Sequence, residues 1–327
     1  MANDIVILGV NGHLGAAAAA GFVAAGWRVT GVARRQTRAL AGLRFVAGDA
    51  GSIEDLRRAI GDASVVLHAL NLPYDKWTGG RLERQTENVL AAVGREGRTL
   101  LFPGNIYSYA AGAGVLTPDT PQVPQTPRGA IRLRVEALLH DAAARGDIQA
   151  LILRAGDFYG PGSRGDWFDQ VILRSIGRGR ISLIGTPGVG HAWAYLPDLA
   201  RGFERLAALR RTLGPCESFH FAGHFVTPEV LGQALQAVLP EARLTRFPLA
   251  LLHLAGLFDA ATRGVARMDY LWRVPLELRD PRFSALLGAD FATPFPAAIA
   301  ATVAAFSGVA PPAGETERRL NTSLTPS

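Results

Sequence analysis

The residues with the clearest chemical potential lie near the N-terminus. There a short apolar run ends in Gly9-Val10-Asn11-Gly12-His13-Leu14-Gly15, and an alanine-rich segment follows. This order predicts a strand, a glycine turn and a helix N-terminus, a combination that binds a dinucleotide diphosphate. Small residues let the backbone approach the phosphates, and the N–H groups of the first helical turn favour their charge. The alternative is a tight turn without a ligand. The predicted cofactor contacts are Gly9, Asn11, Gly12, His13, Leu14 and Gly15.

Two arginines after the second apolar run bear on the choice of cofactor. The run at 27–32 ends in Ala33-Arg34-Arg35. NAD-binding proteins usually place an acid here for the ribose 2′-hydroxyl, whereas a guanidinium pair suits a 2′-phosphate. Arg34 and Arg35 therefore favour NADP over NAD, unless they form only a solvated basic turn. Asp49 follows the third apolar run, where it meets the adenine edge or caps a helix that begins near Ser52.

Alternating strand-like and helical patterns supply the elements that must position these residues. Strands are predicted at 4–9, 27–32, 43–47, 64–69, 98–103 and 149–154, and helices near 13–25, 52–60, 78–95 and 128–146. Such alternation is typical of parallel βαβ units, so the expected fold class is α/β, a Rossmann-type doubly wound parallel sheet with a smaller C-terminal substrate lobe. Ligands of such sheets bind beyond the carboxyl ends of the strands. Ala69 and Asn71, at the end of the fourth predicted strand, are thus further cofactor contacts.

The regular alternation loosens after residue 155. We therefore expect a dinucleotide-binding Rossmann domain over 1–155, to which elements near 190–222 contribute. An interleaved substrate-facing lobe is expected over 156–307. Residues 308–327, which include prolines, threonines and serines, are expected to form a disordered tail.

Composition excludes several classes of protein. The formal charge is +6 and the pI is near 10.1, but basic residues are scattered among acids, so we expect a small phosphorylated cofactor and no nucleic acid. The single cysteine, Cys216, rules out intramolecular disulfides and a cysteine zinc site. The longest apolar stretch, 249–261, predicts one amphipathic helix and is too short to span a membrane. No signal peptide is visible, and a cytoplasmic location is expected.

Four segments resemble the extended short-chain dehydrogenase/reductase family, which contains nucleotide-sugar epimerases and dehydratases. They are the glycine turn 9–15, Arg-Ala-Gly-Asp-Phe-Tyr-Gly-Pro-Gly at 154–162, Ala-Tyr-Leu-Pro-Asp-Leu-Ala at 194–200 and Thr-Pro-Glu-Val-Leu at 227–231. Their order and spacing match the family to about residue 240. The resemblance implies a nicotinamide dinucleotide cofactor and, through pairing of the helices near 78–95 and 128–146, a homodimer.

The chain departs from this family at the catalytic signature. Typical members carry a Tyr-x-x-x-Lys pair at the start of the helix after strand five, in which the lysine lowers the pKa of the tyrosine and holds the nicotinamide ribose. When Glu136 is matched to an acid of that helix, Arg128 takes the tyrosine position and Arg132 the lysine position. Arg132 could still hold the ribose hydroxyls, but neither arginine releases a proton near neutral pH. The resemblance therefore implies an atypical member that lacks the pair.

Other residues are candidates for the missing acid. Asn105 and Tyr107 follow strand five, where Asn105 can donate to a carbonyl oxygen and Tyr107 is either a relocated acid or a packing residue. The loop after strand four contains Tyr74 and Trp77, which we expect to shape the substrate pocket. It also contains the only lysine, Lys76, which is either a proton carrier or part of an exposed turn.

Further substrate contacts are predicted after strand six. Asp157 and Tyr159 follow it directly, and His191 and Trp193 lie further along, in places from which the family draws substrate contacts. His191 is the histidine best situated to titrate near neutral pH, unless it is structural. No metal is expected, because no second histidine or acid stands at metal-ligand spacing.

Three functions are consistent with these residues. The first is an NADP-dependent oxidoreductase or epimerase-like enzyme that acts on a small carbonyl or hydroxyl substrate, with non-standard proton-transfer residues among Tyr107, Asn105 and Arg132. The second is a non-catalytic NADP(H)-binding sensor or regulatory protein. The third is a non-redox isomerase or lyase that uses the cofactor only structurally.

Overall fold

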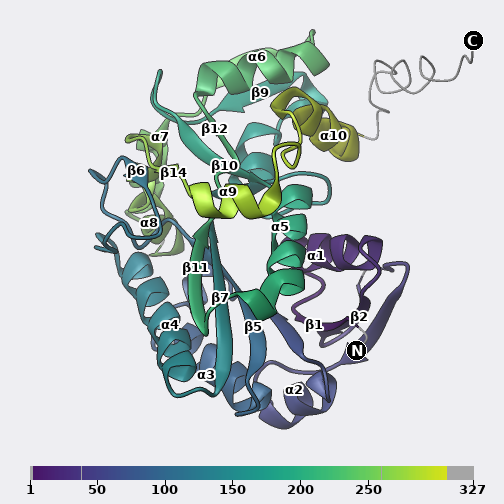
Figure 1. The fold of residues 1–327 in the computed structure, drawn as a ribbon. Coiled ribbons are helices and arrows are strands. Elements are labelled where there is room, and N and C mark those ends of the chain that lie inside the picture. Colours follow the sequence, from purple (N-terminus) through teal and green to yellow (C-terminus); the bar gives the residue numbers. More distant parts are fainter. Residues whose placement is uncertain (1–2, 38, 259, 308–327) are drawn as a thin grey trace, which may run out of the picture.

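The computed structural model describes residues 3–37, 39–258 and 260–307 and is built around a parallel sheet (Figure 1). Within these residues, seven strands pair in the order β11-β7-β5-β4-β1-β2-β3, and every pairing is parallel. The strands are β1 (Asp4–Leu8), β2 (Arg28–Ala33), β3 (Leu43–Ala47), β4 (Val65–His68), β5 (Arg98–Asn105), β7 (Ile148–Ala155) and β11 (Cys216–His220). The predicted α/β Rossmann-type class is confirmed, and the six strands of the first half differ from prediction only at their ends.

Helices cover both faces of this sheet. On one face α1 (His13–Ala24) packs beside α5 (Leu196–Leu209), and the other face carries α2 (Ile53–Ile60), α3 (Arg81–Val93) and α4 (Pro127–Ala144) (Figure 1). Alternate residues of β1 point to opposite faces of the sheet. Ile5 and Ile7 join the apolar cluster under α1 and α5. Val6 and Leu8 join the cluster under α2, α3 and α4. A strand buried on both sides is therefore apolar throughout.

The strand order reverses beside β1. The chain runs outward from β1 to β2 and β3, and then returns to place β4 on the other side of β1. Ligands of open α/β sheets bind in the crevice outside the carboxyl ends of the strands at such a reversal. The loops after β1, β2, β4 and β5 are therefore the ones that position a site.

Smaller sheets lie at one end of the main sheet (Figure 1). They contain β12 (His224–Val226), β10 (His191–Tyr195) and β8 (Asp157–Tyr159); β13 (Arg243–Arg246) and β9 (Arg180–Leu183); and β14 (Glu277–Leu278) and β6 (Val115–Leu116). The α-helices there include α6 (Pro228–Val238), α9 (Pro281–Leu287) and α10 (Phe295–Ser307). The short helical turns are η1 (Tyr74–Lys76), η2 (Phe168–Ile172), η3 (Ile176–Arg178), η4 (Arg210–Thr212) and η5 (Asp269–Trp272).

The apolar stretch 249–261 does not form the single helix that its pattern predicts. It contains α7 (Leu249–Ala255) and the start of α8 (Ala260–Ala266). The two helices approach closely at Gly256, where an added Cβ would lie 2.9 Å from the Cα of Arg263. None of the described helices is long and apolar enough to span a bilayer. The predicted tail, 308–327, lies outside the described residues.

Candidate active site

A cavity of about 1210 Å³ lies along the carboxyl ends of β1, β2, β4, β5 and β7. It brings together most of the site residues that the sequence predicts, although they come from distant parts of the chain. The predicted residues in its lining are Gly9, Asn11, Gly12, His13, Leu14, Arg34, Arg35, Asp49, Ala69, Asn71, Tyr74, Trp77, Asn105, Tyr107, Arg132 and Asp157. Among the described residues, no group of three or more His, Cys, Asp or Glu side chains could hold a metal ion.

The glycine turn forms one end of this cavity. Gly9 has a φ of +89°, and a Cβ there would lie 2.8 Å from the carbonyl oxygen of Ala69. Gly15 does not line the cavity; a Cβ on it would lie 2.3 Å from the Gly9 carbonyl oxygen, so its role is close packing of helix against turn. Gly12 precedes α1 and has no side chain to cap it. The N–H groups of the first turn are thus left for an anion, and the turn fits a dinucleotide diphosphate.

The loop after β2 continues the cavity. Arg34 and Arg35 are exposed and line it, and Ala33 offers no carboxylate at the strand end. Asn11 ties this loop to the glycine turn, because its Nδ2 donates to the Arg35 carbonyl at 2.7 Å and its Oδ1 accepts from the Thr37 N–H at 3.2 Å. The backbone that carries the two arginines is thereby held beside the glycine turn.

Asp49 lines the cavity but does not cap α2. Its Oδ1 accepts from the Gly51 N–H at 2.8 Å. The cap is Ser52, whose hydroxyl accepts from the Asp55 N–H at 3.1 Å. Of the two roles considered for Asp49, helix capping is therefore wrong.

One polar face of α3, which the sequence reasoning missed, also lines the cavity. It presents Arg81, Arg84, Gln85 and Asn88. The Asn88 amide donates to the Ala50 carbonyl at 3.3 Å and so joins α3 to the loop after β3. The available signal was the spacing, since polar residues that recur every three or four positions share one helix face.

Two tyrosine hydroxyls meet at the other end of the cavity. The hydroxyl oxygens of Tyr74 and Tyr107 lie 3.1 Å apart. Tyr107 is buried, and Asn105 fixes its backbone by accepting from its N–H at 3.1 Å. Tyr74 is 39% exposed as a residue, yet desolvation raises its pKa to about 12, and desolvation raises the pKa of Tyr107 well above its usual value. Both phenols therefore remain protonated hydrogen-bond donors at neutral pH.

Helix α4 places three charged side chains on one face toward this end. Arg128, Arg132 and Glu136 follow one another at intervals of four residues, and all three are buried. The Arg128 guanidinium carbon lies 4.9 Å from the Tyr74 ring centroid. Arg132 donates to the carbonyl oxygen of Pro103, at the end of β5.

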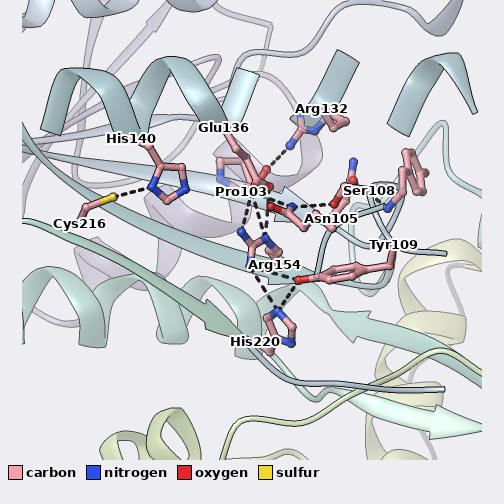
Figure 2. Close-up of polar contacts among 12 residues, drawn as sticks. Pro103, Asn105, Ser108, Tyr109, Arg132, Glu136, His140, Arg154, Cys216 and His220 are labelled. Atoms are coloured by element: carbon pink, nitrogen blue, oxygen red, sulfur yellow. Dashed lines mark hydrogen bonds and ion pairs between the residues drawn. The ribbon is translucent and has the colours of Figure 1, made fainter. Parts of the chain in front are cut away.

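A buried polar network lies behind this end of the cavity (Figure 2). Arg154 Nη2 donates to Glu136 Oε2 at 2.7 Å, and Arg154 Nη1 donates to the Tyr109 hydroxyl at 3.2 Å. The Tyr109 hydroxyl donates in turn to Nε2 of His220 at 2.9 Å, because Nδ1 of His220 donates to the Leu116 carbonyl at 3.0 Å. Burial lowers the pKa of His220 to about 4, which keeps the ring neutral. Gly104 separates this network from the cavity, since a Cβ there would lie 2.4 Å from Arg154 Cγ.

Two aspartates, each paired with a histidine, form a further part of the cavity lining. His13 Nδ1 lies 3.0 Å from Asp166 Oδ2, and His191 Nε2 lies 2.9 Å from Asp157 Oδ2. Both aspartates line the cavity. Burial raises the pKa of Asp166 to about 6, against the opposing effect of His13. Sequence reasoning did not connect His13 with Asp166, which stands in an irregular loop.

Three predicted substrate contacts lie away from the cavity. Tyr159, His191 and Trp193 are buried and do not line it. Tyr159 bonds to Nδ1 of His224 at 2.7 Å, and the His191 ring stacks on Trp272 with centroids 3.7 Å apart. The structure therefore places these three predicted contacts in an aromatic core outside the cavity lining, where β8 and β10 pair.

Trp77 lies in the cavity lining but is a buried core residue. It is 2% exposed, and its indole N–H donates to the Leu72 carbonyl at 2.8 Å. Lys76, by contrast, is exposed at the cavity rim in η1. The loop after β4 is thus anchored by Trp77 and presents Tyr74.

The architecture is shared with solved enzyme structures at low sequence identity. MoeE5 in complex with UDP-glucuronic acid and NAD superposes with a TM-score of 0.74 and 21% identity, over 93% of this chain and 99% of MoeE5. UDP-glucuronic acid 4-epimerase from Bacillus cereus, in complex with UDP-glucuronic acid and NAD, gives 0.73 and 16%, over 94% and 99%. TunA, an NAD-dependent NDP-hexosamine 5,6-dehydratase, gives 0.71 and 18%, over 94% and 98%. At these identities the likeness establishes the fold.

Sequence comparison establishes the family. No curated protein sequence matches the chain significantly. The model of the NAD dependent epimerase/dehydratase family, however, matches residues 5–219, which include the strands of the main sheet apart from the first residue of β1 and the last of β11. The matched region therefore contains both the glycine turn and the tyrosine pair, and the chain belongs to the NAD dependent epimerase/dehydratase family.

Proposed function

We propose that the protein is a nicotinamide-dinucleotide-dependent oxidoreductase or epimerase-like enzyme that acts on a carbonyl or hydroxyl group of a small substrate. The observation that carries the proposal is a single cavity that joins the uncapped start of α1 to the Tyr74–Tyr107 hydroxyl pair. Residues 156–307 would form its interleaved substrate-facing lobe, apart from the elements near 190–222 that join the Rossmann domain. Nucleotide-linked sugars, which two of the solved relatives hold, are one class within this range.

The cofactor is expected to lie along the carboxyl ends of β1 and β2. The glycine turn would hold the diphosphate through the N–H groups of α1, and Asp49 and Ala69 would flank the adenine and ribose. The family model and the solved relatives name NAD. Arg34 and Arg35 favour the phosphorylated form for this chain, because both guanidinium groups are exposed in the cavity without a carboxylate at the strand end.

Proton transfer is proposed to use residues other than a Tyr-x-x-x-Lys pair, since α4 carries Arg128 and Arg132 near its start. A nicotinamide ring bound at this end supplies or accepts a hydride. Tyr107 donates a proton or a hydrogen bond to the reacting oxygen, and Tyr74 exchanges the proton with it across 3.1 Å. Asn105 orients Tyr107 and offers its amide N–H groups to the same oxygen.

Turnover tests the proposal. The protein is incubated with NAD or NADP and a panel of sugar, nucleotide-sugar and small carbonyl substrates, and absorbance at 340 nm is followed. The expected result is turnover that Tyr107→Phe lowers at least about 100-fold. Tyr270→Phe should have a small effect, because the Tyr270 hydroxyl donates to the backbone carbonyl of Tyr107 at 3.4 Å and not to its phenol. Tight cofactor binding without hydride exchange on any substrate would instead support the sensor function.

Cofactor choice has its own test. The double variant Arg34→Ala/Arg35→Ala is expected to weaken NADP binding at least about tenfold and NAD binding little, measured by calorimetry. Arg28→Ala is the control, because Arg28 is exposed at the opposite end of β2. Equal losses for the two cofactors would contradict selection of the phosphate.

A homodimer is proposed through α3 and α4, which pack together on one side of the sheet (Figure 1). Light scattering on the purified protein should give twice the mass of one chain. A monomer at micromolar concentration would contradict it.

A further inference from the structure

The guanidinium of Arg132 is in an unusual electrostatic situation. The residue is 7% exposed and lines the cavity. Within the described chain it has no carboxylate partner; it donates to the Pro103 carbonyl, and its Nε has no partner. Its other neighbours are aromatic, with its guanidinium carbon 4.9 Å from the Phe102 ring centroid and 5.8 Å from that of Trp77. Desolvation accordingly lowers its pKa.

The nearest acid on the same helix is already engaged. Glu136, one turn beyond Arg132, accepts from Arg154 at 2.7 Å and from Gln122 at 3.1 Å. A buried cation that lacks a counter-charge is costly to a fold unless something else supplies the charge. Because Arg132 lines the cavity, that charge can come from a molecule that enters it.

The neighbouring groups are donors as well. Tyr74 and Tyr107 keep their protons at neutral pH, and Asn105 uses its amide oxygen on the Tyr107 N–H, which leaves its NH₂ group available. The donors that line this end of the cavity are thus one guanidinium, two phenols and one amide, while Arg128 lies over the Tyr74 ring and outside the lining. Such a set binds an anionic oxygen pair and stabilises negative charge that develops on a reacting oxygen.

Two carboxylates in the same lining limit how much negative charge a ligand can carry. Asp157 and Asp166 are each engaged by a histidine, His191 and His13 respectively. A singly charged, planar carboxylate matches one guanidinium, whereas a doubly charged phosphoryl group would meet stronger repulsion from these aspartates.

The geometry points to Arg132 as the anchor for a carboxylate carried by the substrate, next to the hydroxyl or carbonyl group that reacts. This rests on the proposed function and narrows its substrate class to hydroxy or keto acids, including sugar acids. Arg132 would thereby act as a specificity-determining residue, with Tyr74, Tyr107 and Asn105 as the accompanying donors.

Matched probes test this assignment without requiring turnover. Glucuronate and glucose differ by a carboxylate in place of a hydroxymethyl group, and UDP-glucuronate and UDP-glucose repeat the comparison on a nucleotide. Binding is followed by calorimetry, with and without NADP, and by tryptophan fluorescence, to which Trp77 beside Arg132 contributes. Each acid is expected to bind at least about tenfold more tightly than its neutral partner.

Variants separate recognition from a structural role. Arg132→Met should abolish the preference for the acids, and Arg132→Lys should keep part of it. Arg134→Met is the control on the same helix, because Arg134 is exposed and pairs with Glu83. Arg132→Met should also leave the thermal midpoint unchanged or higher, because it removes an uncompensated charge.

Three outcomes would overturn the assignment: equal binding of acid and neutral probes, a preference that survives Arg132→Met, or a lower thermal midpoint in Arg132→Met. Failure of the proposed function looks different. The acid preference would then persist while dinucleotide titrations show no binding.

Discussion

The buried pair Glu136–Arg154 offers a direct test of how the wall behind the cavity is held. Glu136→Gln keeps the shape of the side chain and removes its charge. Arg154 places three N–H···O contacts on this carboxylate, at 2.7, 3.1 and 3.3 Å, and the two side chains are 1% and 4% exposed. The substitution would leave a buried guanidinium without its counter-charge, a change that costs about 3 to 5 kcal/mol of unfolding free energy.

Urea denaturation measures this loss. With an m value of about 3 kcal/mol/M, a loss of 3 kcal/mol lowers the midpoint by about 1 M. Arg134→Gln is the matched control, since Arg134 pairs with Glu83 at 2.8 Å from the same helix but is 58% exposed. Because the Arg134 guanidinium of this pair is in solvent and the Glu83 side chain is 15% exposed, removing Arg134 should cost less than breaking the fully buried pair. Equal losses for the two variants, or a loss below about 1 kcal/mol for Glu136→Gln, would refute the reasoning.

A second arm separates the charge from the packing. In the double variant Glu136→Met/Arg154→Met both charges are gone, so the loss should be smaller than the sum of the two single losses. Additive losses would show that the ion pair is not what holds α4 against β7.

Three other substitutions test the glycine turn, a buried histidine and an aspartate of the cavity lining. Gly15→Ala places a Cβ 2.3 Å from a backbone oxygen of the turn and should weaken dinucleotide binding more than about tenfold in calorimetry, well beyond Gly12→Ala, where the distance is 3.3 Å. Burial lowers the pKa of His68 to about 3, so as pH falls this ring is protonated in the unfolded chain before it is protonated in the folded chain. The free energy of unfolding of the wild type therefore falls with decreasing pH. His68→Leu should reduce the loss between pH 7 and 5 by on the order of 2 kcal/mol in urea unfolding, and the exposed His140→Leu should not. Because burial raises the pKa of Asp166 to about 6, this carboxyl gains charge as pH rises from 5 to 7; the affinity for NAD, which has no 2′-phosphate to titrate, should fall more steeply over that range in the wild type than in Asp166→Asn.

The local elements and the dinucleotide cradle could be predicted from the sequence because their causes are local. The apolar run 4–8, the small residues of the glycine turn and the following alanines dictate a strand, a turn and a helix without reference to distant residues. The parallel alternation then fixes which loops share one edge of the sheet, which is why Arg34, Asn71 and Asn105 were expected at the same cavity.

The contacts across the cavity depended on the tertiary structure. His13 and Asp166 are 153 positions apart, and Tyr74 and Tyr107 belong to different loops, so no local pattern reveals that their polar atoms lie within 3.1 Å. Tyr159, His191 and Trp193 illustrate the converse, because strand pairing turned them into the core although their side chains could bind a substrate. The charge state of a side chain is decided in the same way. The sequence predicts that Arg132 lies on a helix face. In the described structure Arg132 packs against Phe102 and Trp77 while Glu136 pairs with Arg154, which leaves the Arg132 charge without a carboxylate partner. Desolvation and ion pairing depend on three-dimensional surroundings, so the sequence alone could not reveal this.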